Sequence, residues 1–252
     1  RNTDLTWERT TQTNVGLDWT MLKNRLSVNF DWYYKYTTDM LMWVSLPAGS
    51  AAVSSIQRNE GEMSNMGVEL TITSHNFVKK NSKWDTQLNI SHNKNRLEKL
   101  ATSQVYYDAK VTDILADYCV RNAPGMPLGS FYGYKTGGVN PETGELIYLD
   151  TNEDGEVTAN DRTYMGDPNP DFTFGMTNTF QFYGVTLSFL LQGSYGNDIF
   201  NASRIETEGM YDGKNQSARV LNRWKIPGQI TDVPKANFKL LNSTYFVEDG
   251  SY

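Results

Sequence analysis

The sequence predicts an all-β protein: an antiparallel segment of a transmembrane β-barrel, with about six long strands and long extracellular loops. Three observations support this prediction. Apolar and polar residues alternate with period two in separate segments along the chain. Each segment approaches the roughly 9 to 11 residues that a tilted strand needs to cross a bilayer. Short and long connections between the segments alternate strictly, as they do in outer-membrane barrels.

The first two predicted strands form a hairpin. In residues 14–22 the apolar side chains are Val15, Leu17, Trp19 and Met21, and polar or small residues separate them. In residues 25–36 the apolar side chains are Leu26, Val28, Phe30, Trp32, Tyr34 and Tyr36. Successive side chains of a strand point to opposite faces, so each strand has one apolar and one polar face.

The later segments repeat this design. Residues 67–73 and 84–91 form the second pair, with Val68, Leu70, Ile72, Trp84, Leu88 and Ile90 on the apolar face. Residues 172–182 and 185–195 form the third pair, whose apolar side chains are Phe172, Phe174, Met176, Phe180, Phe182, Val185, Leu187, Phe189, Leu191 and Tyr195. Aromatic side chains near strand ends are expected to form the interfacial girdles of a barrel: Trp19, Trp32, Tyr34, Trp84, Phe180 and Phe182.

The connections divide into two kinds. Tight turns are predicted near Asn24, near Asn81 and at Tyr183–Gly184. Long connections are predicted at residues 37–65, 96–170 and 196–245. Structureless links of that length count against a compact soluble domain. In an outer-membrane barrel the short turns face the periplasm and the long loops face outward.

The alternative is a soluble β-sandwich, whose strands also alternate. Sandwich strands are usually about five or six residues long, and their connections are seldom so unequal. The polar faces here carry charged and amide side chains that suit a water-filled lumen better than a packed core: Asp18, Asp31, Glu69, Asp85 and Gln192. The sequence therefore favours the barrel.

Composition excludes several function classes. The formal net charge is −6, which favours neither nucleic acid nor an anionic membrane surface as a partner. A single cysteine, Cys119, excludes an internal disulfide framework. No apolar run approaches the roughly 18 residues of a transmembrane helix. The first residue is Arg1 and no signal peptide follows it, so we expect a piece of a longer chain.

No catalytic constellation emerges, so we expect no enzyme. His75 and His92 are the only histidines. If the turn near Asn81 joins their strands, His75 pairs near Asp85 and His92 near Val68, too far apart to share a metal or a proton. Residues 129–136, "GSFYGYKT", fail the spacing of a phosphate-binding loop and are better explained as a strand or a close crossing.

One stretch has the pattern of a calcium-binding loop. Residues 150–161, "DTNEDGEVTAND", place side-chain oxygens at Asp150, Asn152 and Asp154, the carbonyl at Glu156 and a closing acid at Asp161. Strand-like flanks in place of helices argue against a calcium sensor. Two interpretations stay open: a structural Ca²⁺ that fixes the loop, or a metal-free turn rich in Asp and Asn.

Five phrases give a specific resemblance that runs along the whole chain. They are "NVGLDWTMLKNRLSVNFDWYYKYTTDML", "NEGEMSNMGVELTI", "GMPLGSFYGYKTGGV", "GDPNPDFTFGMTNTFQFYGVTLSFLLQGSYGNDIFN" and "YFVEDGSY". They occur in the order of the C-terminal part of SusC/RagA-family transporters. The chain is similar to these TonB-dependent (TonB-linked) outer-membrane transporters of Bacteroidota-type bacteria.

The resemblance implies a barrel of about 22 strands with an N-terminal plug. It also implies import of glycan or peptide oligomers, with energy from TonB through the plug and with a SusD-like surface lipoprotein as a lid. Residues 1–252 would then be a partial barrel domain in outer-membrane lipid, without the plug and the final strands. Residues 96–170 would be a long extracellular loop region that carries the acidic loop at 150–161.

Two loops are candidates for contact with a sugar or with the lid: residues 47–63 and residues 223–237, the latter with Trp224. A self-packed loop is an equally good account of each. A second function class also stays open. It is a secreted or surface binding and adhesion module whose β-sheet loops are braced by calcium.

Overall fold

The computed structural model describes residues 4–45, 55–100, 106–110, 118–211 and 213–252. Its main feature is one six-stranded sheet, here called the wall sheet, with strand order β1-β2-β3-β4-β11-β12. Every neighbouring pair is antiparallel. The strands are β1 (Arg9–Met21), β2 (Leu26–Ser45), β3 (Ser55–Lys79), β4 (Ser82–Lys99), β11 (Phe172–Phe182) and β12 (Val185–Tyr195). The predicted fold class is therefore confirmed.

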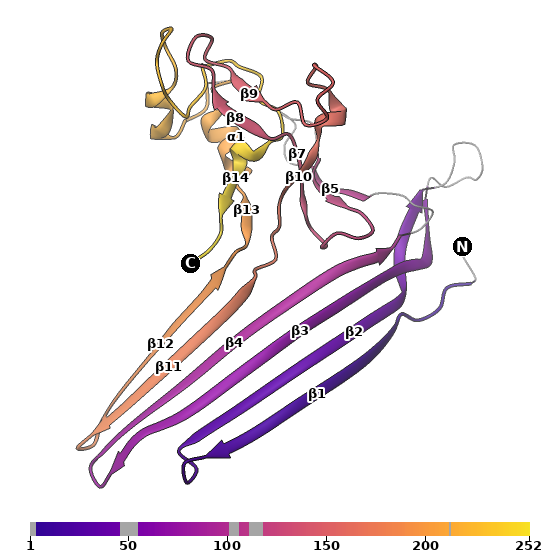
Figure 1. Ribbon diagram of the computed structural model, residues 1–252. Helices are drawn as coiled ribbons and strands as arrows, with labels where there is room; N and C mark the ends of the chain where they lie inside the picture. Colours follow the sequence, from indigo (N-terminus) through magenta and orange to yellow (C-terminus); the bar gives the residue numbers. More distant parts are fainter. Residues whose placement is uncertain (1–3, 46–54, 101–105, 111–117, 212) are drawn as a thin grey trace.

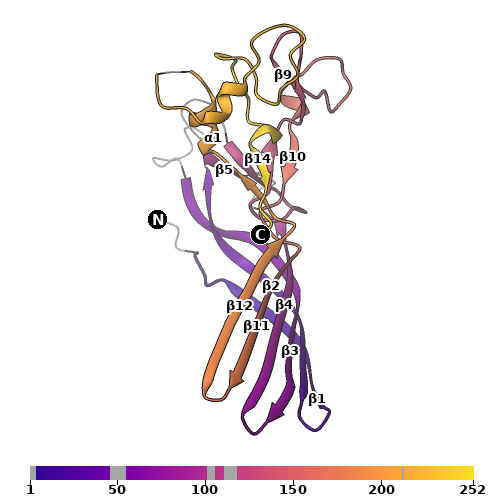
Figure 2. The same ribbon diagram turned by 90° about the vertical axis from the view of Figure 1, so that its left-hand side faces the viewer.

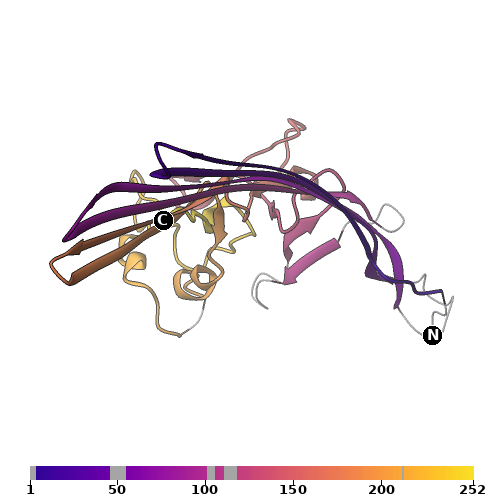
Figure 3. The same cartoon turned by 90° about the horizontal axis from the view of Figure 1, so that it is seen from below.

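The wall sheet is a single curved layer (Figure 1). The three hairpin turns lie at one end, here called the turn end, and the long connections lie at the other, the loop end (Figure 2). Seen from below in Figure 3, the strands trace an arc, and most of the loop residues lie on its concave side. Strands β1 and β12 form the edges of the sheet, so it does not close on itself within this chain.

The predicted tight turns are confirmed. Leu22, Lys23 and Asn24 have φ angles of 54°, 55° and 67° between β1 and β2. Tyr183 and Gly184, with φ angles of 46° and 84°, form a two-residue turn between β11 and β12. Positive φ at both central residues matches the twist of a hairpin, and a glycine at the second position lowers its cost.

The predicted long loop at residues 37–65 is wrong for the part that the structure describes. Strand β2 continues to Ser45 and β3 begins at Ser55, and these two residues are paired. A bulge at Asp39, with a φ of 56°, interrupts the ladder without ending it. With 20 and 25 residues, both strands exceed the roughly 9 to 11 that a bilayer requires. In its loop-end half, β2 carries five consecutive apolar residues, Met40 to Val44, and β3 is mostly polar from Ser55 to Asn65, so neither segment alternates with period two.

The register places the apolar residues of all six strands on one face, here called the apolar face. Val15 lies opposite Trp32, which lies opposite Val68. Leu70 faces Ile90, which faces Phe174. The other surface is called the polar face. A one-residue slip would exchange the two faces, so the alternation in the sequence fixes the register of the whole sheet.

The described parts of the two long connections, residues 100–171 and 196–249, pack together into one loop body. It contains β5 (Tyr106–Lys110), β6 (Tyr118–Asn122), β7 (Phe131–Gly133) and β10 (Thr163–Gly166) in one four-stranded sheet. Two small sheets pair β8 (Thr136–Val139) with β9 (Leu146–Tyr148) and β13 (Asp198–Phe200) with β14 (Val247–Asp249). Its helical segments are α1 (Ser203–Glu208), η2 (Ala159–Asp161), η3 (Ala218–Asn222) and η4 (Thr244–Phe246).

The core of the loop body draws on both connections. Leu146 from the first packs against Ile205, Leu240 and Phe246 from the second, and all four are buried. Gly133 explains the residues "GSFYGYKT" as a close crossing, because a Cβ there would lie 2.5 Å from the Asn242 carbonyl oxygen. Among the described residues, no helix has the length and hydrophobicity that crossing a membrane would require.

Candidate functional site

The polar face of the wall sheet carries a ladder of hydrogen-bonded side chains. The Asn29 amide donates to Asp18 across β1 and β2, at 2.5 Å, and the Thr71 hydroxyl donates to Asn89 across β3 and β4, at 3.0 Å. Ser91 and Thr173 share a hydrogen bond of 2.8 Å across β4 and β11. These pairs hold the polar groups in fixed positions and leave a continuous hydrophilic surface.

Three carboxylates lie close together on this face. Asp31 is directly opposite Glu69 on β3, and Asp18 is two residues along β1 from Gly16, the partner of Asp31. All three side chains are exposed. Gly16 makes room for Asp31, because a Cβ there would lie 2.7 Å from its carboxylate oxygen. The middle of the polar face is therefore negatively charged.

The two histidines occupy the predicted partners but opposite faces. His75 pairs with Asp85 and Val68 pairs with His92, which confirms the predicted register. The His75 imidazole Nδ1 lies 2.5 Å from the Asp85 carboxylate on the polar face. His92 belongs to the apolar face, where its Nδ1 contacts the Asp171 carbonyl. The two side chains cannot act on one substrate, because the sheet separates them.

The apolar face carries a polar cluster near the turn end, and no pattern in the sequence predicted it. Asn178 is only 6% exposed. Its side-chain carbonyl accepts hydrogen bonds from Trp84 Nε1 at 3.0 Å and from the Thr86 hydroxyl at 2.7 Å. Trp84 stacks on Phe180 with ring centroids 5.3 Å apart. A polar group facing lipid must find its partners within the protein, and this cluster supplies them.

A partly buried network of charges around α1 stabilises the loop body. Arg204 pairs with Glu208 at 3.1 Å and with Glu248 at 3.2 Å. Arg219 reaches the same Glu208 carboxylate, at 3.3 Å. The Arg204 guanidinium also lies 4.5 Å from the centre of the Tyr245 ring. Burial, together with the nearby Glu208 carboxylate, raises the pKa of the Tyr245 phenol to about 12.

The acidic loop closes through its own backbone. Gly155, with a φ of 91°, turns the chain, and its N–H donates to the Asp150 carboxylate at 2.7 Å. Buried Asp161 accepts from the N–H groups of Thr158 and Thr151, at 2.7 and 2.8 Å. The Thr158 bond is the largest of the contacts that lower the pKa of the Asp161 carboxyl.

The five predicted calcium ligands thus lie in one loop, but their oxygens are used differently. The Asp154 carboxylate accepts from the Glu156 N–H and from the Asn152 amide, at 3.0 and 2.9 Å. Within the described ranges, no three acidic, histidine or cysteine side chains are arranged to hold a metal ion. A cation would have to draw Asp150, Asp154 and Asp161 together, so calcium stays a prediction.

Trp224 packs inside the loop body. Its Nε1 donates to the Pro141 carbonyl at 2.7 Å, and its ring covers Gly144, where a Cβ would clash. Around Trp224, residues 223–237 are therefore a loop that packs against the protein itself. Of the other candidate loop, residues 55–63 belong to β3 and the remainder lies outside the described residues.

These features define a class of protein. Apolar side chains at both edges of the wall sheet are 58 to 71% exposed, and no second layer of the described residues covers them: Val15, Leu17, Trp19, Val185 and Leu187. A soluble sandwich or secreted module would bury such a band against a second sheet. A curved sheet with an apolar outer face and a polar inner face is the wall of an outer-membrane β-barrel.

The family follows from comparison with known proteins. A family described as "TonB dependent receptor-like, beta-barrel" matches residues 1–233, and the chain belongs to this family. TonB-dependent receptor P3 of Formosa agariphila is 33% identical over 100% of this chain and 26% of its own length. TonB-dependent receptor SusC of Bacteroides thetaiotaomicron is 29% identical over 86% of this chain and 23% of its own length. The SusC/RagA-type resemblance and the outer-membrane location are therefore confirmed.

Solved structures agree with this assignment. A structure of the RagAB peptide transporter superposes with a TM-score of 0.84 at 26% identity, over 99% of this chain and 28% of that chain. The RagAB peptide importer in its "open-open" state gives a TM-score of 0.83, with 26% identity over 99% of this chain and 27% of that chain. The chain spans about a quarter of the length of the relatives that it matches.

Proposed function

We propose that this chain forms part of the wall and the outer mouth of a TonB-dependent importer of oligomeric nutrients. The observation that carries the proposal is the continuous polar inner face, backed by an apolar outer face and covered at one end by the loop body. Such a wall can pass a hydrophilic solute through a membrane without exposing it to lipid. Residues 1–252 would be a partial barrel domain, with the plug supplied elsewhere in the protein.

The proposed orientation follows from the two kinds of connection. The turn end lies in the periplasm and the loop body lies outside the cell. Residues 96–170 are then extracellular, together with the acidic loop at 150–161. The loop body is well suited to this position because it has its own core and does not depend on lipid for burial.

The proposed cargo is a peptide or glycan oligomer that is neutral or cationic. RagAB is a peptide transporter by its title, which supports a peptide. Asp18, Asp31 and Glu69 give the inner face an unbalanced negative patch, because no ion pair within the described residues neutralises them. Like charges repel over roughly 10 Å at moderate salt, so a polyanionic oligomer would be disfavoured.

The proposed partners act at the two ends of the barrel. A SusD-like lipoprotein would cover the loop body, where Leu221, Ile226 and Ile230 expose apolar side chains to water. The TonB complex would act through a plug. Energy must come from such a partner, since the sequence holds no nucleotide-binding loop. We propose no enzymatic step. His75 and Asp85 form the one His–Asp pair of the described residues, and we identify no nucleophile for this pair.

We further propose that the acidic loop takes one structural Ca²⁺ through Asp150, Asn152, Asp154, the Glu156 carbonyl and Asp161. Support comes from the turn at Gly155 and from the carboxylates of Asp150 and Asp161, which both accept backbone N–H groups of this one loop. A divalent cation would relieve the repulsion between like charges held so close. The ion would order the loop and take no part in transport chemistry.

The deciding experiment measures uptake by cells that carry the full-length receptor. Fluorescent peptide and glycan oligomers of matched size are offered to cells with and without TonB. Uptake of the cognate oligomer should stop without TonB and continue with it. Uptake that is unchanged by the deletion would show a passive porin and refute the proposal. The class of oligomer that enters then identifies the cargo.

A further inference from the structure

The turn end of the wall sheet is a concentrated site of positive charge. The turn between β1 and β2 carries Lys23 and Arg25. Lys80 lies in the turn between β3 and β4, with Lys79 at the end of β3 and Lys83 near the start of β4. Residues 21–25, 77–84 and 181–186 contain no Asp or Glu. The chain as a whole has a formal net charge of −6, so this end has the opposite sign to the rest of the molecule.

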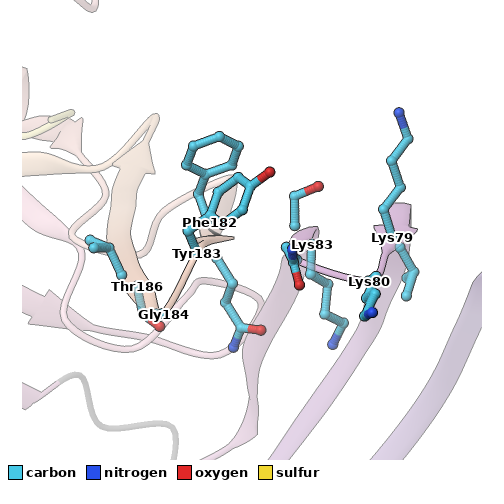
Figure 4. A pocket seen from close by; sticks show the side chains of 12 residues that line it. Lys79, Lys80, Lys83, Phe182, Tyr183, Gly184 and Thr186 are labelled. Atoms are coloured by element: carbon cyan, nitrogen blue, oxygen red, sulfur yellow. The ribbon is translucent and has the colours of Figure 1, made fainter.

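Two of the turns enclose a groove. It lies between residues 78–83 and residues 181–186 and has a volume of about 580 Å³. Figure 4 shows the groove with its lysines on one side and with Phe182 and Tyr183 on the other. The two rings meet edge to face, with centroids 4.7 Å apart. Both are well exposed, Phe182 at 63% and Tyr183 at 69%.

The groove opens toward the apolar face. Lys79 pairs with Ser82, Ser82 pairs with Phe182, and Phe182 pairs with Val185, so these side chains form one row. In Figure 4 the Lys79 side chain extends to the same side as the rings of Phe182 and Tyr183. At the turn end, this row is the last of a stripe of exposed apolar side chains that includes Leu187. A cation therefore lies where the apolar surface meets water.

Only one of the three groove lysines is neutralised. Lys83 forms an ion pair of 2.6 Å with Asp85 on the polar face. Lys79 and Lys80 are exposed, and neither forms an ion pair with any of the residues that the structure describes. Exposed cations with no protein partner leave their charge available to a ligand, and their long stems can lie along apolar surface.

We propose that this groove binds the headgroup of an anionic glycerophospholipid in the periplasmic leaflet. The phosphate would lie against the Lys79 ammonium group, with Lys80 beside it in the turn. The glycerol and acyl chains would lie along Phe182, Val185 and the outer face above them. The proposal rests on the membrane placement of the proposed function, and it assigns a specific lipid contact that family membership alone does not supply.

The arrangement favours a lipid over an acidic periplasmic protein. A docking site for a protein would need its charges to face the periplasm or the lumen. Here the cation Lys79 is on the lipid-facing row, in line with an aromatic ring and an uninterrupted apolar stripe. An amphiphile with an anionic head and an apolar tail matches both halves of that row. Basic residues next to a membrane contribute about 1 kcal/mol each toward anionic lipid, or about fivefold in binding.

The test uses the purified full-length receptor in detergent and native mass spectrometry. The protein is titrated with phosphatidylglycerol or with phosphatidylcholine of the same acyl chains. We expect the wild type to retain the anionic lipid in preference. The Lys79→Gln/Lys80→Gln variant should lose about 25-fold of that preference, from two cations at about fivefold each. The Lys79→Arg/Lys80→Arg variant keeps the charge and should retain the preference.

Controls distinguish a lipid site from the other outcomes. The Lys225→Gln/Lys239→Gln variant removes two exposed lysines of the loop body and should behave as wild type. Glycerol 3-phosphate added in excess should not displace the lipid, because it lacks the acyl chains. Displacement would show a site for free phosphate and overturn the proposal. So would a wild type without lipid preference, or equal preference in the glutamine variant. Heat-modified gel mobility, which reports the folded barrel, confirms that each variant is folded, so lipid binding is scored independently of transport.

Discussion

The Tyr33 hydroxyl on β2 donates a hydrogen bond of 2.9 Å to the side-chain carbonyl of Asn93 on β4, although β3 lies between them. Gly67 is the residue of β3 that pairs with both. A Cβ on Gly67 would lie 2.5 Å from the Tyr33 hydroxyl oxygen and 2.6 Å from the His92 carbonyl oxygen. The missing side chain is therefore what lets one ring span three strands of the wall.

The first prediction concerns this glycine. Gly67→Val should destabilise the full-length barrel by about 1–3 kcal/mol, because it forces a branched side chain into occupied space. Gly175→Val is the matched control on β11, where the nearest atom to a new Cβ is 3.9 Å away. Urea unfolding in micelles, followed by tryptophan fluorescence, compares the two. Equal losses for both variants would show that crowding at Gly67 is unimportant.

The second prediction concerns pH. The pKa of Tyr245 is raised to about 12 by burial and by Glu208, from an ordinary value near 10. The folded loop body therefore holds this proton more tightly than the unfolded chain does. Its stabilising effect is complete below about pH 10 and is lost as the pH rises toward about 12. Pulse proteolysis with an alkaline protease measures the opened fraction of the loop body.

Tyr245→Phe should flatten that alkaline loss without abolishing it. Burial also raises the pKa values of Tyr148 and Tyr211 in the same body, so part of the dependence remains. A variant with the full wild-type slope would place the alkaline transition elsewhere.

The third prediction concerns calcium. Calorimetry on the metal-free full-length receptor should show one Ca²⁺ with an affinity of about 10⁻⁴ to 10⁻³ M, as in extracellular modules. Asp154→Ala should abolish the heat. Glu153→Gln, a neighbouring acid outside the proposed ligand set, should leave it unchanged. Equal heats for wild type and Asp154→Ala would leave only a metal-free turn.

The fourth prediction concerns orientation. In a Cys119→Ser background, Ile230→Cys on the loop body should react with an impermeant maleimide on intact cells. Ile230 is 94% exposed, so access does not limit the reaction. Asn81→Cys in the turn between β3 and β4 should react only after the outer membrane is permeabilised. The reverse pattern would invert the proposed topology.

The fifth prediction concerns cargo charge. Replacing Asp18, Asp31 and Glu69 by their amides removes three negative charges from the inner face and preserves side-chain size. Uptake of an anionic oligomer should rise relative to a cationic one of the same length. The matched variant Asp198→Asn changes a carboxylate of the loop body and should not alter the ratio. A ratio that is also unchanged in the triple variant would remove these carboxylates from selectivity.

Strand alternation predicted the wall sheet because a barrel strand meets two different solvents. Leu70 and Glu69 are neighbours in β3 but lie on opposite faces, so the polarity of each residue indicates its face. The same reasoning failed at residues 37–45 and 55–65, where β2 and β3 continue toward the loop end. There β2 has an unbroken apolar run from Met40 to Val44 and β3 is mostly polar, so the periodic signal disappears. Backbone pairing alone continues the strands to Ser45 and Ser55.

The candidate sites were predictable to a smaller extent. Asn178 is a polar residue at a position of β11 where the alternation calls for an apolar one. Only its hydrogen bond from Trp84 on the neighbouring strand explains it. The Arg204 network joins residues up to 44 positions apart, which no local pattern reveals. Net charge is a sum over 252 residues, so it does not report the local excess of positive charge at Lys79 and Lys80.

The shared core of Leu146, Ile205, Leu240 and Phe246 has a consequence for engineering. Residues 100–171 and 196–249 are separate in the chain, but neither contains a complete interior without the other. A chimera that exchanges only one of them between two receptors would join mismatched halves. The pair exchanged together, with the hairpin of β11 and β12 left in place, would behave as a single transplantable cassette on a foreign barrel.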